Sequence, residues 1–186
     1  MKKILILILI IIFIGCKESK DKLDLIRIQE YSILIEIPVG TNEKWELNMI
    51  NNKIERDSLN NLPRTIKYLN YPFNYGMILN TNNSGDNDPL DAIVIGNRFE
   101  IGDTIQAKPI AIINTLDKGK SDPKILFIHS SSPLHQISSK KELKEKFPGV
   151  LKIIKIWLNN YKKESEVIDI QGQKNAIKLI KKSTIK

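Results

Sequence analysis

Residues 86–95 read DNDPLDAIVI, an acidic loop that runs directly into a short apolar stretch. The first six residues carry three carboxylates, and the β-branched residues after them predict a short buried strand. Oxygen ligands of this kind suit Mg²⁺. The spacing does not fit an EF-hand, because Leu90 stands at a ligand position and Asp91 where that loop requires glycine. The segment alone therefore predicts either a metal-binding loop or a solvated Asn/Asp turn.

A second acidic loop lies further along the chain. Asp117 and Asp122 stand between two predicted strands, and Lys124 follows them closely. Five carboxylates brought together would repel one another and raise one another's pKa unless a cation or basic groups compensated. A phosphate ligand would need both cationic side chains and metal ions around it.

The strands on either side of these loops are short. Apolar and β-branched runs at 32–37, 92–95, 104–113 and 124–128 predict strands. Pro109 lies within the third run and indicates an edge or a bulge, because proline cannot donate a ladder hydrogen bond.

The last third of the chain changes period. Ser139 and Glu142 form a capping-box pattern before a helix, which Phe147-Pro148-Gly149 interrupts. Apolar residues then recur at helical spacing, at Val150, Ile154, Trp157 and Tyr161. Strands followed by helix predict an α+β protein, with a small antiparallel sheet or barrel against which a helix packs.

Six ordered segments carry a family resemblance. YPFNYG (71–76) and DNDPLD (86–91) resemble the soluble inorganic pyrophosphatases of the Mg²⁺-dependent family I. Four other segments resemble that family in the same order: IEIP at 35–38, KWE at 44–46, the loop of Asp117 and Asp122 with Lys124, and Tyr161-Lys162. The resemblance covers about residues 32–165, and the ordered set is far more specific than any one motif.

The resemblance implies a fold, a reaction and its partners. The fold would be a small five-stranded OB-like β-barrel with flanking helices, including a long helix in the C-terminal third. The reaction would be hydrolysis of inorganic pyrophosphate to two phosphates, with several Mg²⁺ ions in each site. Bacterial members of the family commonly assemble, so homo-oligomers are among the implied partners.

The resemblance also implies roles for individual residues. Asp88 would be the general base toward a metal-activated water, with Glu36 and Glu46 supporting the site. The metal ligands would be Asp86, Asp91, Asp117 and Asp122. The residues that bind the two phosphoryl groups would be Lys44, Arg64, Tyr75, Lys124, Tyr161 and Lys162.

Two of these assignments have alternatives. Arg64 fits the spacing before Tyr71, whereas Arg56 lies nearer to Lys44 and competes for the same role. Tyr161 continues the apolar helical pattern and would also serve as an ordinary core residue.

The composition limits other classes of function. Of 186 residues 29 are basic and 21 acidic, which gives a net charge of +8. Lysine accounts for 25 of the basic residues, whereas arginine is favoured for bidentate phosphate contacts, so a solvated lysine surface is expected rather than a nucleic-acid interface. One cysteine and two histidines exclude an internal disulfide and disfavour a zinc cluster.

The N-terminus reads as a bacterial lipoprotein signal. Two lysines precede 11 apolar residues, which as a helix would span about 16 Å, too short for a bilayer core of about 30 Å. The following FIGC (13–16) resembles a lipobox, which would place lipid on Cys16 and the protein on a membrane outside the cytoplasm, at its periplasmic or cell-surface face. A plain signal peptide or an uncleaved anchor is the alternative. We expect a signal peptide at 1–15, a tether at 16–31 and the pyrophosphatase domain at 32–186.

Two other functions compete with hydrolysis. A lipoprotein could keep the fold and use it for anion capture or surface attachment without turnover. An OB-like barrel with a basic surface could bind single-stranded nucleic acid, but aromatic residues make up only 6% of the chain. The resemblance assigns the phenol groups to phosphate, so we expect no nucleic-acid partner.

Overall fold

The computed structural model describes residues 29–83 and 88–185. The predicted leader, Cys16 and most of the predicted tether lie outside these residues. The strands are β1 Tyr31–Ile37, β2 Trp45–Asn48, β3 Lys53–Arg56, β4 Ser58–Leu59, β5 Leu62–Pro63, β6 Asn74–Ile78, β7 Asp91–Ile95, β8 Thr104–Asp117, β9 Lys120–Ser121, β10 Lys124–His129 and β11 Ser165–Gly172. The helices are α1 Lys140–Lys146, α2 Pro148–Asn160 and α3 Gln173–Ser183.

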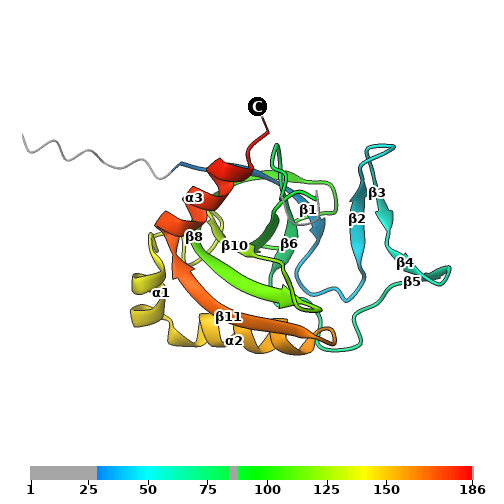
Figure 1. Cartoon of the computed structure of the whole chain (residues 1–186). Coiled ribbons are helices and arrows are strands. Elements are labelled where there is room, and N and C mark those ends of the chain that lie inside the picture. Colours follow the sequence, from blue (N-terminus) through cyan, green and yellow to red (C-terminus); the bar gives the residue numbers. More distant parts are fainter. Residues whose placement is uncertain (1–28, 84–87, 186) are drawn as a thin grey trace, which may run out of the picture.

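Within the described residues, a mixed seven-stranded sheet forms the body of the protein (Figure 1). Its strands run in the order β1-β6-β7-β10-β8-β11, and β8 also pairs with β1 and β9. The pairing thus returns from β8 to β1, and β9 and β11 extend the sheet beyond the five strands that the resemblance implied. Most neighbours are antiparallel, but β7 and β10 are parallel, which brings the beginnings of these two strands side by side.

The central strands separate two apolar cores. In β7, Ala92 and Val94 belong to one core, whereas Ile93 belongs to the other. The strand period of two sends alternate side chains to opposite faces, so a strand covered on both faces reads as a continuous apolar run. Pro109 lies at the predicted irregularity, where the register of β8 against β10 shifts.

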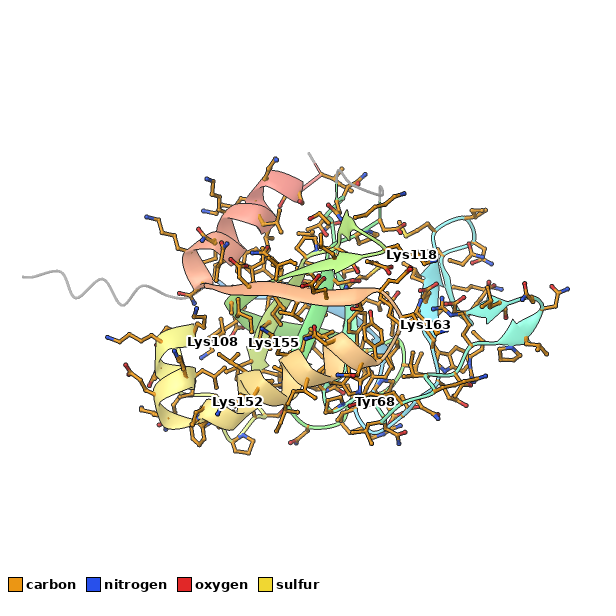
Figure 2. All side chains as sticks on the ribbon, turned by 60° about the horizontal axis from the view of Figure 1, so that its bottom comes forward. Tyr68, Lys108, Lys118, Lys152, Lys155 and Lys163 are labelled. Carbon is orange, nitrogen blue, oxygen red and sulfur yellow. The ribbon has the colours of Figure 1, made fainter. Side chains whose placement is uncertain are left out.

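The C-terminal third has the predicted interruption at Phe147-Pro148-Gly149, but not the long helix that the resemblance implied. Helix α1 ends at Lys146 and the 13-residue α2 begins at Pro148, because proline suits the first turn of a helix but not its interior. The predicted cap of α1 is present, since the Ser139 side chain accepts a hydrogen bond from the backbone N–H of Glu142. Lys152 and Lys155 project from α2 into solvent (Figure 2).

Strand β11 and helix α3 were not predicted from the sequence. β11 pairs with β8 along its length, and α3 packs against the core that contains Ile33 and Phe127. The polar sequence of β11 hides the strand, since Ile168 is exposed and only Val167 is buried in it. In the part of the chain that the structure describes, no helix combines the length and apolarity needed to cross a membrane.

Gly76 allows β6 to lie close against β1. A Cβ atom on Gly76 would overlap the backbone carbonyl oxygen of Leu34, and backbone cannot rotate away as a flexible side chain can. We therefore expect Gly76→Ala to lower the free energy of unfolding by about 3 kcal/mol or more, measured by urea denaturation.

Gly149 provides the matched control for this substitution. It lies in the first turn of α2, and a Cβ atom there would meet nothing within 4 Å. Gly149→Ala should be neutral or stabilising by about 0.5 kcal/mol, because alanine reduces the freedom of the unfolded chain. Equal effects at the two positions would contradict the proposed clash.

Candidate active site

A cavity of about 330 Å³ opens beside the first residues of β7 and β10. It gathers eleven of the thirteen predicted site residues from segments far apart in the sequence. They are Glu36, Lys44, Glu46, Tyr75, Asp88, Asp91, Asp117, Asp122, Lys124, Tyr161 and Lys162.

The floor of the cavity is an ammonium group held between two carboxylates. Lys124 is 1% exposed, and its Nζ lies 2.5 Å from Asp91 Oδ2 and 2.9 Å from Asp122 Oδ1. Burial alone would lower the pKa of Lys124, but the charge of Asp91 and other neighbours raises it above its usual range. Lys124 is therefore protonated and links the two acidic loops.

A second lysine contacts two aspartates of the second acidic loop, nearer the rim. Lys162 Nζ lies 2.8 Å from Asp117 Oδ2 and 3.6 Å from Asp122 Oδ2. Asp122 thus contacts both lysines, and burial raises its pKa. Asp117 Oδ1 is buried without a hydrogen-bond partner, so the lysines leave one acceptor of the second acidic loop unsatisfied.

The donor chemistry of the cavity fits a hard divalent cation. Every acidic ligand supplies oxygen, and the buried Asp117 Oδ1 is an acceptor that such a cation would satisfy. Among the described residues, no three acidic, histidine or cysteine side chains gather closely enough to hold a metal ion together. Asp86, the remaining predicted ligand, lies outside the described residues.

A third cluster lies beside the start of β2, where Lys44 and Glu46 line the cavity. Asp57 Oδ2 accepts hydrogen bonds from Lys44 Nζ at 2.9 Å and from Arg64 Nη1 at 2.5 Å. Lys44 also contacts Glu46. Asp57 was not predicted as a site residue, because it lies outside the recognised segments and meets its partners only in the folded chain.

The two competing arginines occupy different surroundings. Neither Arg56 nor Arg64 is among the described residues that line the cavity. Arg64 shares Asp57 with the cavity residue Lys44, whereas Arg56 pairs with Glu43 at 2.8 Å and lies over the Trp45 ring. The shared carboxylate of Asp57 links Arg64 to a residue that lines the cavity. This agrees with the spacing before Tyr71, which also favours Arg64, and the role of Arg64 stays a prediction.

Glu36 is the most deeply buried carboxylate on the cavity wall. It is 7% exposed in β1, and its Oε1 accepts a hydrogen bond from the backbone N–H of Leu47 at 2.8 Å. Burial raises the pKa of Glu36 to about 7, a shift that the hydrogen bond only partly offsets. The side chain thus connects the hairpin of β2 and β3 to the sheet.

Aromatic side chains form the remaining wall. Tyr161 stacks on Trp157 with ring centroids 4.5 Å apart and also lines the cavity, so it belongs to both the core and the site. Lys162 Nζ lies 5.3 Å from the centroid of the Tyr161 ring. Burial raises the pKa of Tyr75 well above its usual range, so its hydroxyl stays protonated and can donate a hydrogen bond.

Fold and cavity together define an α+β protein with a polar site that suits an anionic ligand and a hard cation. The family model described as inorganic pyrophosphatase matches residues 33–186. The chain therefore belongs to the inorganic pyrophosphatase family.

Individual relatives agree with this assignment. Over 149 residues the chain is 34% identical to an inorganic pyrophosphatase of Dictyostelium discoideum, covering 72% of this chain and 53% of the relative. A truncated vacuolar soluble pyrophosphatase of Trypanosoma cruzi, solved with PPi, has a TM-score of 0.78 at 28% identity, covering 83% of this chain and 67% of that one. An inorganic pyrophosphatase of Neisseria gonorrhoeae has a TM-score of 0.70 at 25% identity, covering 84% of this chain and 90% of that one. The chain spans about half the length of the curated relatives it matches.

The raised pKa of Glu36 predicts a pH-dependent stability. Its pKa is about 7 in the folded protein and 4.5 in a model peptide, so between these values the folded state binds more protons. The free energy of unfolding should therefore fall as pH rises through this window, by up to about 3 kcal/mol from this group.

Glu36→Gln tests this contribution, because it keeps an acceptor for Leu47 but cannot ionise. In chelator, where no divalent cation offsets the charge, the variant should gain stability relative to the original protein between pH 5 and pH 8. Urea denaturation at the two pH values measures the difference. A stability difference that is the same at both would rule out the raised pKa.

Proposed function

We propose that this protein hydrolyses inorganic pyrophosphate to two phosphates with Mg²⁺ as its divalent cation. One observation carries the proposal: eleven predicted residues from six ordered segments line one cavity. The similarity to a pyrophosphatase solved with PPi supports the choice of substrate. Anion capture without turnover would use the same cavity, and the assay below separates the two functions.

The acidic loops would hold the cation. Asp91, Asp117 and Asp122 line the cavity, and the resemblance adds Asp86 as the fourth ligand. A bound divalent cation would lower the pKa of a water molecule from about 15.7 towards 7 and offset charge on phosphoryl oxygens.

The side chains of the cavity supply the other parts of the reaction. Lys44, Lys124 and Lys162 present ammonium groups that stabilise the charge gained by the leaving phosphate. Tyr75 donates a hydrogen bond without adding charge, since its hydroxyl stays protonated. Asp88 lines the same cavity and is assigned to accept the proton of the attacking water.

Phosphate release tests this assignment directly. The detergent-solubilised full chain should release phosphate from pyrophosphate when Mg²⁺ is present, and a chelator should stop it. Asp88→Asn should lower kcat by about 10²- to 10⁴-fold, the usual contribution of a general base, with a smaller effect on pyrophosphate affinity. Release no faster than in a metal-only blank, or binding without turnover, would refute hydrolysis.

We further propose that lipid on Cys16 holds the enzyme at a membrane outside the cytoplasm. The support is the sequence FIGC after a charged start and a short apolar run. Several acyl chains on one cysteine would anchor stably, whereas a single chain binds only marginally. Removal of residues 1–15 would take away Lys2 and Lys3 and reduce the net charge from +8 to +6.

The anchor has its own test. Cells that express the full chain should incorporate labelled palmitate into it, and the protein should sediment with membranes. Cys16→Ser should lose both the label and the membrane fraction. Protease treatment of intact cells then reports the face on which the protein lies. A Cys16→Ser protein that keeps its label would disprove the assignment.

A further inference from the structure

We propose that Lys120 forms a subsite for a third phosphoryl group, so that linear inorganic triphosphate is a second substrate of this protein. The inference rests on the proposed hydrolysis of pyrophosphate and extends it outward from the same cavity. It concerns a side chain that no recognised segment includes, although Lys120 lines the cavity.

A tight hairpin directs Lys120 toward the acidic loop. Strand β9 pairs with β8 so that Lys120 lies directly opposite Asp117. The two residues between them, Lys118 and Gly119, have φ of 50° and 78°, as the favoured two-residue hairpin turn requires. Residues directly opposite in an antiparallel pair project from the same face, so Lys120 shares the face of Asp117.

The chain after Lys120 continues along the cavity. Every residue from Lys120 to Lys124 lines it, and Lys120, Asp122 and Lys124 form a row of three charged side chains. Their burial increases along the row, since Lys120 is exposed, Asp122 is intermediate and Lys124 is 1% exposed. The row therefore runs from the mouth of the cavity to its floor, along the path that a linear ligand would take.

The charge of Lys120 is not used by a carboxylate. Among the described residues, Lys44, Lys124 and Lys162 each form an ion pair with an aspartate of the site, but Lys120 forms none. A group reaching the mouth from a diphosphate bound deeper would meet this ammonium. In a linear phosphate chain, that group is a third phosphoryl.

The size of the cavity and the chemistry both accommodate this ligand. A volume of about 330 Å³ is at the lower end of cavities that hold drug-sized molecules, which exceed a diphosphate in size. Water would attack the terminal phosphorus, the P–O–P bond would break, and pyrophosphate would leave with the bridging oxygen while the water proton passes to Asp88. The pyrophosphate released would then be a substrate for a second hydrolysis.

Kinetics of Lys120→Gln in the full chain test the subsite. The measured quantity is kcat/KM for inorganic triphosphate divided by kcat/KM for pyrophosphate, both in Mg²⁺. The variant should lower this ratio about tenfold, the effect of losing one charge-assisted hydrogen bond. Lys120→Glu should lower the ratio further, because it places a negative charge beside an anion.

Lys118 provides the matched control. It is an exposed lysine of the same hairpin (Figure 2), and the cavity lining does not include it. Lys118→Gln should leave the ratio unchanged. Hydrolysis of pyrophosphate without hydrolysis of triphosphate, or equal ratios for Lys120→Gln and Lys118→Gln, would overturn the subsite. Failure to hydrolyse either substrate would instead overturn the proposed function on which the subsite rests.

Discussion

The structure depends on placing one buried ammonium group between two acidic loops. A charge as buried as that of Lys124 is tolerated only when it is paired, and loss of a partner would leave it uncompensated. The parallel register of β7 and β10 provides the pairing, since it sets Lys124 directly opposite Asp91. Among the strands of the sheet within residues 29–83 and 88–185, the one parallel pairing thus also joins the first acidic loop to the second.

The other charges of the site follow the same rule of shared partners. Asp122 contacts both Lys124 and Lys162, and Asp57 contacts both Lys44 and Arg64. Each of these two carboxylates lies between two cations, which holds the charged groups in place. A chain with a net charge of +8 thus keeps several aspartates in its site by pairing them with lysine and arginine.

The sequence motifs pick out residues that the fold gathers around one cavity, whereas they do not reveal the C-terminal strand and helix; the roles of the cavity residues stay predictions. Acidic residues directly before strands, and the spacing of Lys124 from Asp122, fix their positions locally, so motifs were sufficient there. Asp57 could not be found in this way, because its carboxylate meets Lys44 and Arg64 only once the chain has folded. Strand β11 was not predicted because its stability comes from hydrogen bonds to β8 rather than from an apolar pattern. The long helix that the resemblance implied is replaced by α1 and α2, which meet at the break that Pro148 predicts.

The small hairpin of β4 and β5 has a consequence for how this chain can vary. Arg64 donates a backbone hydrogen bond to Asp57 at 2.7 Å, so the six residues between them leave the sheet and return to the same point. Their side chains at Leu59 and Leu62 are exposed, and the turn residues Asn60 and Asn61 have positive φ. Because exposed loop tips tolerate insertions, this excursion is a permissive position where a peptide tag or a small domain can be grafted without disturbing the charged pair at its base.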